Sequence, residues 1–220
     1  MLAVGARRGT VCLQLAALQF LVLTSVSIAL YPEYRFADQF LSELGATRTA
    51  WGVPNRGAAA LFGCALGIFG AALVVFAAAW RDYAFERRRA RWLGVASQVC
   101  GTLSGLAFVT AACTPIDIAL AAHNSVVVAA FGLLLGFVAC TTALWSRNGA
   151  PAGAVVAGAA YAAVLVVYFG AVAWAVASGL FAHRRVLIVG QKIVVAASLG
   201  YVVYLTLVIR RRAWAVSGAT

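Results

Sequence analysis

Residues 31–56, YPEYRFADQFLSELGATRTAWGVPNR, form the one long polar interval between apolar segments in this chain. The interval contains Glu33, Asp38 and Glu43, which are half of the six acidic residues. Polar groups at a membrane rim are where recognition or chemistry can occur, because such groups are costly to hold within lipid. We therefore expect residues 31–56 to be an outer loop that covers the functional site.

The composition around this loop indicates an integral membrane protein. Of the 220 residues, 64% are hydrophobic and 10% charged, and the mean hydropathy is +0.96, whereas soluble domains are about a quarter charged. The net charge of +11 does not indicate nucleic-acid binding, because the basic residues lie between apolar segments and no RNA- or DNA-binding motif accompanies them.

Six apolar segments are each long enough to cross roughly 30 Å of hydrocarbon as a helix rising 1.5 Å per residue. They predict transmembrane helices over about residues 10–30, 57–80, 92–112, 119–145, 151–177 and 186–209. The predicted fold class is all-α, a polytopic bundle of six transmembrane helices in a single integral membrane domain over residues 1–220.

The distribution of arginine predicts the orientation of this bundle. With the N-terminus inside, the cytoplasmic segments hold eleven arginines and the outer segments five. The positive-inside rule then places both termini in the cytoplasm and residues 31–56 outside. The bias toward Arg, Ala, Gly and Val suggests a GC-rich bacterial genome, so we expect the bacterial cytoplasmic (inner) membrane.

Pairs of glycines four residues apart predict close helix packing, because small residues let helix backbones approach within lipid. The pairs are Gly63 and Gly67, Gly101 and Gly105, and Gly132 and Gly136. Packing within one chain is the preferred interpretation, and a homo-oligomer through these Gly-rich faces is the alternative.

A few polar residues within or beside the predicted spans need partners, because a charge at mid-membrane costs at least about 2.5 kcal/mol. Lys192 lies roughly 10 Å down the sixth span from its outer end, and His123 lies at a comparable depth in the fourth. The surrounding candidates are Asn55, Asn124 and Asp117, with Asp38, Ser42 and Glu43 above them in the loop. We expect one outward-facing polar pocket, in which Lys192 pairs with Glu43 or Asp117.

Purely structural roles are the alternative for the same residues. Lys192 could snorkel to the headgroups, His123 could bond a carbonyl across helices, and Gly45 could cap a helix end. One fold rarely needs so many costly groups on one side only for packing, which favours a functional interpretation of the cluster.

The chain resembles the six-helix prokaryotic membrane family labelled domain of unknown function 998. The residues that carry the resemblance are Ser42-Glu43-Leu44-Gly45, Pro54-Asn55, Pro115, Asp117, His123 and Gln191-Lys192. The sequence departs from the family pattern at Ile116, which separates Pro115 from Asp117. The resemblance implies six helices but no established activity. A more distant similarity in layout, to eukaryotic membrane proteins that remodel GPI-anchor lipids or modulate autophagy, suggests a lipid substrate.

The first functional hypothesis is a membrane protein that acts on or binds a lipid. As an enzyme it would use His123 as general base or acid, Asp117 or Glu43 to orient it, and Ser42 as nucleophile. Lys192 or Arg185 would hold an anionic headgroup. Gln191, Asn55, Asn124 and Asp38 complete the substrate-binding candidates. Whether the protein is an enzyme stays undecided.

Two rival hypotheses remain. A non-catalytic scaffold or partner-binding protein would pair the loop acids with Arg35, Arg48 and Arg56 and leave no open cavity. A transporter needs a continuous polar path, which the spans lack, so it ranks last. No cofactor is expected, and a zinc site is disfavoured because His123 and His183 are the only histidines.

Overall fold

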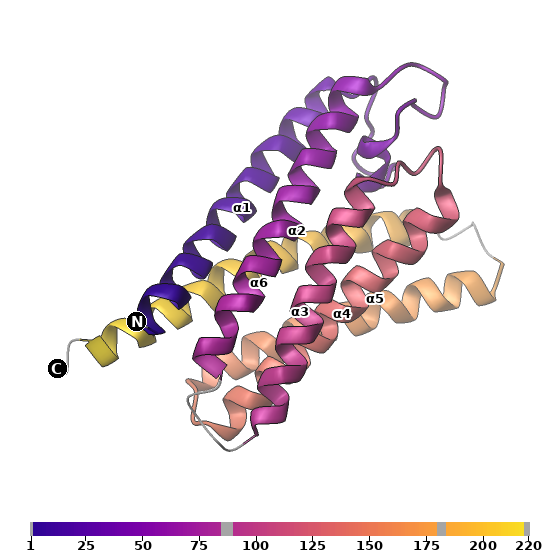
Figure 1. Cartoon of the computed structure of the whole chain (residues 1–220). Helices are drawn as coiled ribbons and strands as arrows, with labels where there is room; N and C mark the ends of the chain where they lie inside the picture. Colours follow the sequence, from indigo (N-terminus) through magenta and orange to yellow (C-terminus); the bar gives the residue numbers. More distant parts are fainter. Residues whose placement is uncertain (1, 85–89, 180–183, 218–220) are drawn as a thin grey trace.

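The computed structural model of the chain describes residues 2–84, 90–179 and 184–217 and shows an all-α bundle (Figure 1). The long helices are α1 (Leu2–Leu30), α2 (Arg56–Ala84), α3 (Arg91–Ala112), α4 (Leu120–Arg147), α5 (Ala152–Ala177) and α6 (Arg184–Ser217). A short 3-10 helix, η1 (Leu41–Gly45), lies in the loop between α1 and α2.

All six long helices are long and apolar enough to span a membrane, which confirms the predicted fold class. Their membrane-compatible segments are Arg8–Leu30, Arg56–Trp80, Arg91–Ala112, Leu120–Arg147, Ala152–Ala177 and Arg184–Arg211. Each end lies within two residues of the end expected from sequence. The chain is therefore a multi-pass membrane protein.

Helices α1 to α4 pack side by side in chain order, and α6 packs along α1 and α5. The α2–α3 contact is closest at Gly70 and Gly105, where a Cβ on either glycine would lie 2.6 Å from the other's carbonyl oxygen. Gly105 thus plays the packing role predicted for it. Gly132 does not, because a Cβ there would meet nothing within 4 Å.

Helix α5 packs between α4 and α6, and a smaller share of its membrane-compatible segment is buried than in any other long helix. Its side chains are largely apolar, and several remain exposed on its outer face, including Val156, Val166, Val167 and Val176. In a membrane this face meets lipid, which explains why it can be so hydrophobic.

The loop between α1 and α2 closes over the end of the bundle opposite both chain ends (Figure 1). Its second half makes a tight turn, in which Thr49 donates its N–H to Val53 O at 2.8 Å and Gly52 has a φ of 80°. Glycine adopts this left-handed conformation without steric cost. Residues 36–46 of the loop, which contain η1, are called the lid below.

Candidate functional site

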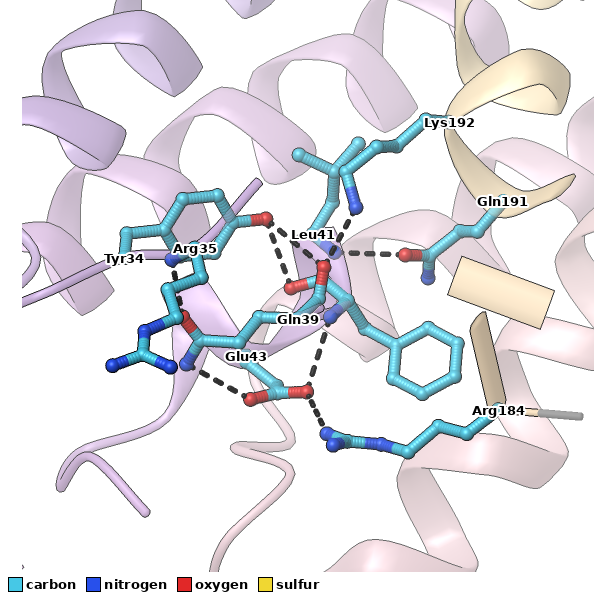
Figure 2. Close-up of polar contacts among 9 residues, drawn as sticks. Tyr34, Arg35, Gln39, Leu41, Glu43, Arg184, Gln191 and Lys192 are labelled. Atoms are coloured by element: carbon cyan, nitrogen blue, oxygen red, sulfur yellow. Dashed lines mark hydrogen bonds and ion pairs between the residues drawn. The ribbon is translucent and has the colours of Figure 1, made fainter. Parts of the chain in front are cut away.

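The Glu43 carboxylate organises the polar contacts of the lid (Figure 2). Its Oε1 accepts hydrogen bonds from Phe40 N at 3.0 Å and from Arg184 Nη2 at 2.8 Å. Its Oε2 accepts one from Gln39 Nε2 at 3.3 Å. Glu43 therefore caps the N-terminus of η1 and also joins the lid to the first residue of α6.

Two neighbouring residues of α6 hold the lid backbone directly (Figure 2). Lys192 Nζ donates to Gln39 O at 2.6 Å and lies 4.7 Å from the centre of the Phe36 ring. Gln191 Oε1 accepts the N–H of Leu41 at 2.8 Å. A main-chain donor and a main-chain acceptor that α1 and α2 leave unpaired are thus satisfied by the last helix.

Two further contacts support the same arrangement. Arg185 Nε donates to Asp38 Oδ1 at 3.0 Å. Tyr34 Oη donates to Phe40 O at 3.2 Å and to Gln39 O at 3.4 Å. Burial, followed by the negative charge of Glu43, raises the pKa of Tyr34 well above its usual range, so the hydroxyl stays a donor.

Asp117, in the turn between α3 and α4, holds the second half of the loop. Its carboxylate accepts hydrogen bonds from Thr47 N at 3.0 Å, Thr47 Oγ1 at 2.7 Å and Arg48 N at 3.1 Å. Partial burial works to raise the pKa of Asp117, but these donors favour the charged form more strongly and lower the pKa. Asp117 thus acts as an anchor for the loop.

Asn55 has a similar structural role at the end of the loop. Its buried Nδ2 donates to Leu44 O at 3.1 Å and to Ala46 O at 2.8 Å, while its Oδ1 has no hydrogen-bond partner among the residues that the structure describes. The side chain therefore ties η1 to the start of α2.

A cavity of about 70 Å³ lies beneath the lid among α1, α2, α3, α4 and α6. Its polar lining residues are Ser42, His123, Gln191 and Ser198, and the others are mainly phenylalanine, leucine and valine. This volume suits several water molecules or a short length of hydrocarbon chain. Three residues predicted for the site, Ser42, His123 and Gln191, therefore meet at one cavity.

His123 is the most unusual residue of this lining, because it is 95% buried and only half satisfied. Its Nδ1 lies 2.7 Å from Thr114 O, whereas its Nε2 is buried and has no hydrogen-bond partner in the described part of the chain. The carbonyl can only accept, so Nδ1 carries the proton in the neutral ring and Nε2 is left as an acceptor.

Several expected contacts differ in the structure. Lys192 forms no ion pair with Glu43 or Asp117 among the described residues, because Arg184 reaches Glu43 and the loop backbone surrounds Asp117. Asn124 is exposed and does not line the cavity. His183 lies outside the described residues.

Sequence reasoning missed Arg184, Gln39 and Thr47 as site residues. Arg184 sits at a helix end, where it looked like one more headgroup-facing arginine. Gln39 O accepts from Lys192 and Thr47 Oγ1 donates to Asp117, and both partners lie far along the chain. Only the spacing of Gln39 four residues before Glu43 could have indicated a pair.

Within the described part of the chain, no three His, Cys, Asp or Glu residues are grouped so that they could hold a metal ion. No family model, curated protein or solved structure matches this chain. The six-helix layout implied by the resemblance is present, and membership of that family stays a prediction.

Proposed function

We propose that this multi-pass membrane protein binds a lipid-derived molecule in the cavity beneath the lid. A short apolar segment of the ligand would lie among the phenylalanine and leucine side chains, and a hydroxyl would reach His123. The observation that carries the proposal is that His123 lines this largely apolar cavity and its buried Nε2 has no hydrogen-bond partner among the described residues.

The chemistry of the cavity defines the ligand. A buried acceptor without a partner costs about 1–3 kcal/mol, so a ligand that donates a hydrogen bond to Nε2 recovers this free energy. The Ser42 hydroxyl and the amide of Gln191 offer further polar contacts at the same cavity. An alcohol on an apolar chain matches this set better than a charged headgroup, because the cavity lining contains no charged side chain.

Binding is favoured over catalysis by the positions of the other candidates. No hydrogen bond joins Ser42 to His123 among the described residues, so no activated nucleophile is assembled. Asp117 and Glu43 are engaged by Thr47 and Arg184, and Thr114 O takes the orienting position at Nδ1. General-base catalysis by His123 is the second candidate, favoured by its acceptor Nε2.

Photo-crosslinking with a long-chain fatty alcohol that carries a diazirine tests the binding proposal. The purified protein is expected to be labelled on α4 and α6 beside the cavity. Val127→Phe fills the cavity and should abolish this labelling, whereas Val128→Phe, on an exposed neighbouring residue, should retain it. Gel filtration and circular dichroism verify that both variants fold. Equal labelling of the two folded variants would refute the proposed site.

Comparing the lipid composition of strains with and without a functional His123 distinguishes catalysis from binding. If His123 catalyses a reaction, a strain carrying His123→Ala should accumulate one lipid class and lose another while the protein is expressed normally. A binding protein leaves the composition of the lipid pool unchanged.

A further inference from the structure

A second apolar depression lies between α5 and α6, open to the surface of the bundle. It has a volume of about 660 Å³. Its apolar lining includes Val167 and Tyr168 on α5 and Val189 and Ile193 on α6. It shares no lining residue with the cavity beneath the lid. We call it the α5–α6 groove.

Glycine at position 190 shapes this groove. A Cβ there would lie 2.8 Å from the Tyr168 ring, so the absence of a side chain lets the ring lie against α6. The walls are apolar over their whole length except at the end nearest the lid, where Arg185 belongs to the lining. A hydrocarbon chain that lies along the helices fits such walls.

Arg185 provides a cation at the end of the groove with unused donors. Its side chain is 82% exposed, and only its Nε is bonded, to Asp38 Oδ1. Its two terminal nitrogens make no hydrogen bond to a described residue. The guanidinium fork can bind two phosphate oxygens at once, so it can engage a phosphate while Nε remains on Asp38.

We propose that the α5–α6 groove binds one acyl chain of an anionic glycerophospholipid from the leaflet on the lid side, with Arg185 on its phosphate. The proposal goes beyond the proposed function, because the two sites are lined by different residues. Charge favours this occupant over a second copy of the chain: two copies that pack the same face together would bring two Arg185 side chains into one patch.

Native mass spectrometry of the full-length protein tests the proposal with two lipids of identical acyl chains, phosphatidylglycerol and phosphatidylcholine. The wild-type protein should bind the anionic lipid in preference. Arg185→Gln should reduce this preference by about fivefold, as expected for the loss of one arginine near a membrane surface. Arg56→Gln, an exposed arginine at the start of α2 on the same side of the bundle, should keep it.

One further pair of variants and one single variant separate the groove from the lid. Val167→Trp fills the groove and should lower binding of both lipids, whereas Val166→Trp, also exposed but outside the groove, should not. Asp38→Asn breaks the ion pair with Arg185 and should retain the preference for phosphatidylglycerol.

Three results would overturn the proposal. The first is an unchanged lipid preference in folded Arg185→Gln. The second is equal lipid binding by the two tryptophan variants. The third is a Val167→Trp protein that loses a dimer and keeps its lipids, which would assign the groove to a contact between copies.

Discussion

Glu43 in the lid and Arg184 at the start of α6 form an ion pair 2.8 Å long, although 141 residues separate them in the chain. The Glu43 side chain is 15% exposed and that of Arg184 is 51% exposed. Among the described residues, four side chains of α6 hold the lid by polar contacts: Arg184 and also Arg185, Gln191 and Lys192. The first prediction follows from the ion pair.

Glu43→Gln should loosen the lid without unfolding the bundle. The amide keeps an acceptor for Phe40 N but loses the charge that Arg184 pairs with. Because this ion pair is partly exposed, we expect a loss of about 1 kcal/mol, or about fivefold faster amide exchange in residues 36–46. Hydrogen exchange followed by mass spectrometry measures the exchange rate of these amides. Glu33→Gln, at an exposed acid of the same loop, should exchange like the wild type.

The Asp117 anchor should weaken in acid. The pKa of Asp117 is lower in the folded chain than its ordinary value of 3.8, so its contribution to stability is complete above that value. It is lost as pH falls through the folded pKa. Exchange of the Thr47 and Arg48 amides, corrected for intrinsic rates, should therefore accelerate below about pH 4.

Asp117→Asn provides the control for this pH dependence. The variant should show fast exchange at Thr47 and Arg48 already at neutral pH and no further loss of protection from this group in acid. A wild-type protein whose two amides keep full protection well below the ordinary pKa range would contradict the anchor.

His123→Asn should separate the structural role of Nδ1 from the ligand-binding role that we propose for Nε2. The asparagine amide can still donate to Thr114 O, so thermal stability should change by less than about 1 kcal/mol. The asparagine side chain has no atom in the place of Nε2, so the affinity for a fatty alcohol should fall by about tenfold, as for one lost buried hydrogen bond. Competition by the unlabelled fatty alcohol against the diazirine probe measures this affinity. Asn124→Ala, at the exposed neighbour, should leave both quantities unchanged.

Gly105→Ala should be strongly destabilising. The new Cβ would lie 2.6 Å from Gly70 O and 2.8 Å from Val74 Cγ2, so α2 and α3 must separate. Overpacking of this kind costs about 1–3 kcal/mol, measured by thermal unfolding in detergent. Gly132→Ala has open space around its Cβ and should be neutral or slightly stabilising. Equal melting temperatures for the two variants would argue against the close helix contact.

The helices could be predicted from sequence because each apolar run is long enough to span a bilayer and polar segments separate the runs. The sequence predicted that Ser42 in the loop would lie above His123 in the fourth span, and both residues line one cavity. The partner of Lys192 could not be predicted, because it is the carbonyl oxygen of Gln39, a group that every residue carries. The cavity depends on how phenylalanine side chains from several helices pack, which composition does not reveal.

The contacts of the lid also determine when the binding cavity can exist. Arg184, Arg185, Gln191 and Lys192 all belong to α6, so during synthesis they enter the bilayer after α1 to α5. Until then, residues 36–46 lack four of the side chains that hold them in place. A chain that has not yet inserted α6 therefore lacks both these lid contacts and the part of the cavity lining that α6 supplies, so the ligand binding that we propose requires this helix.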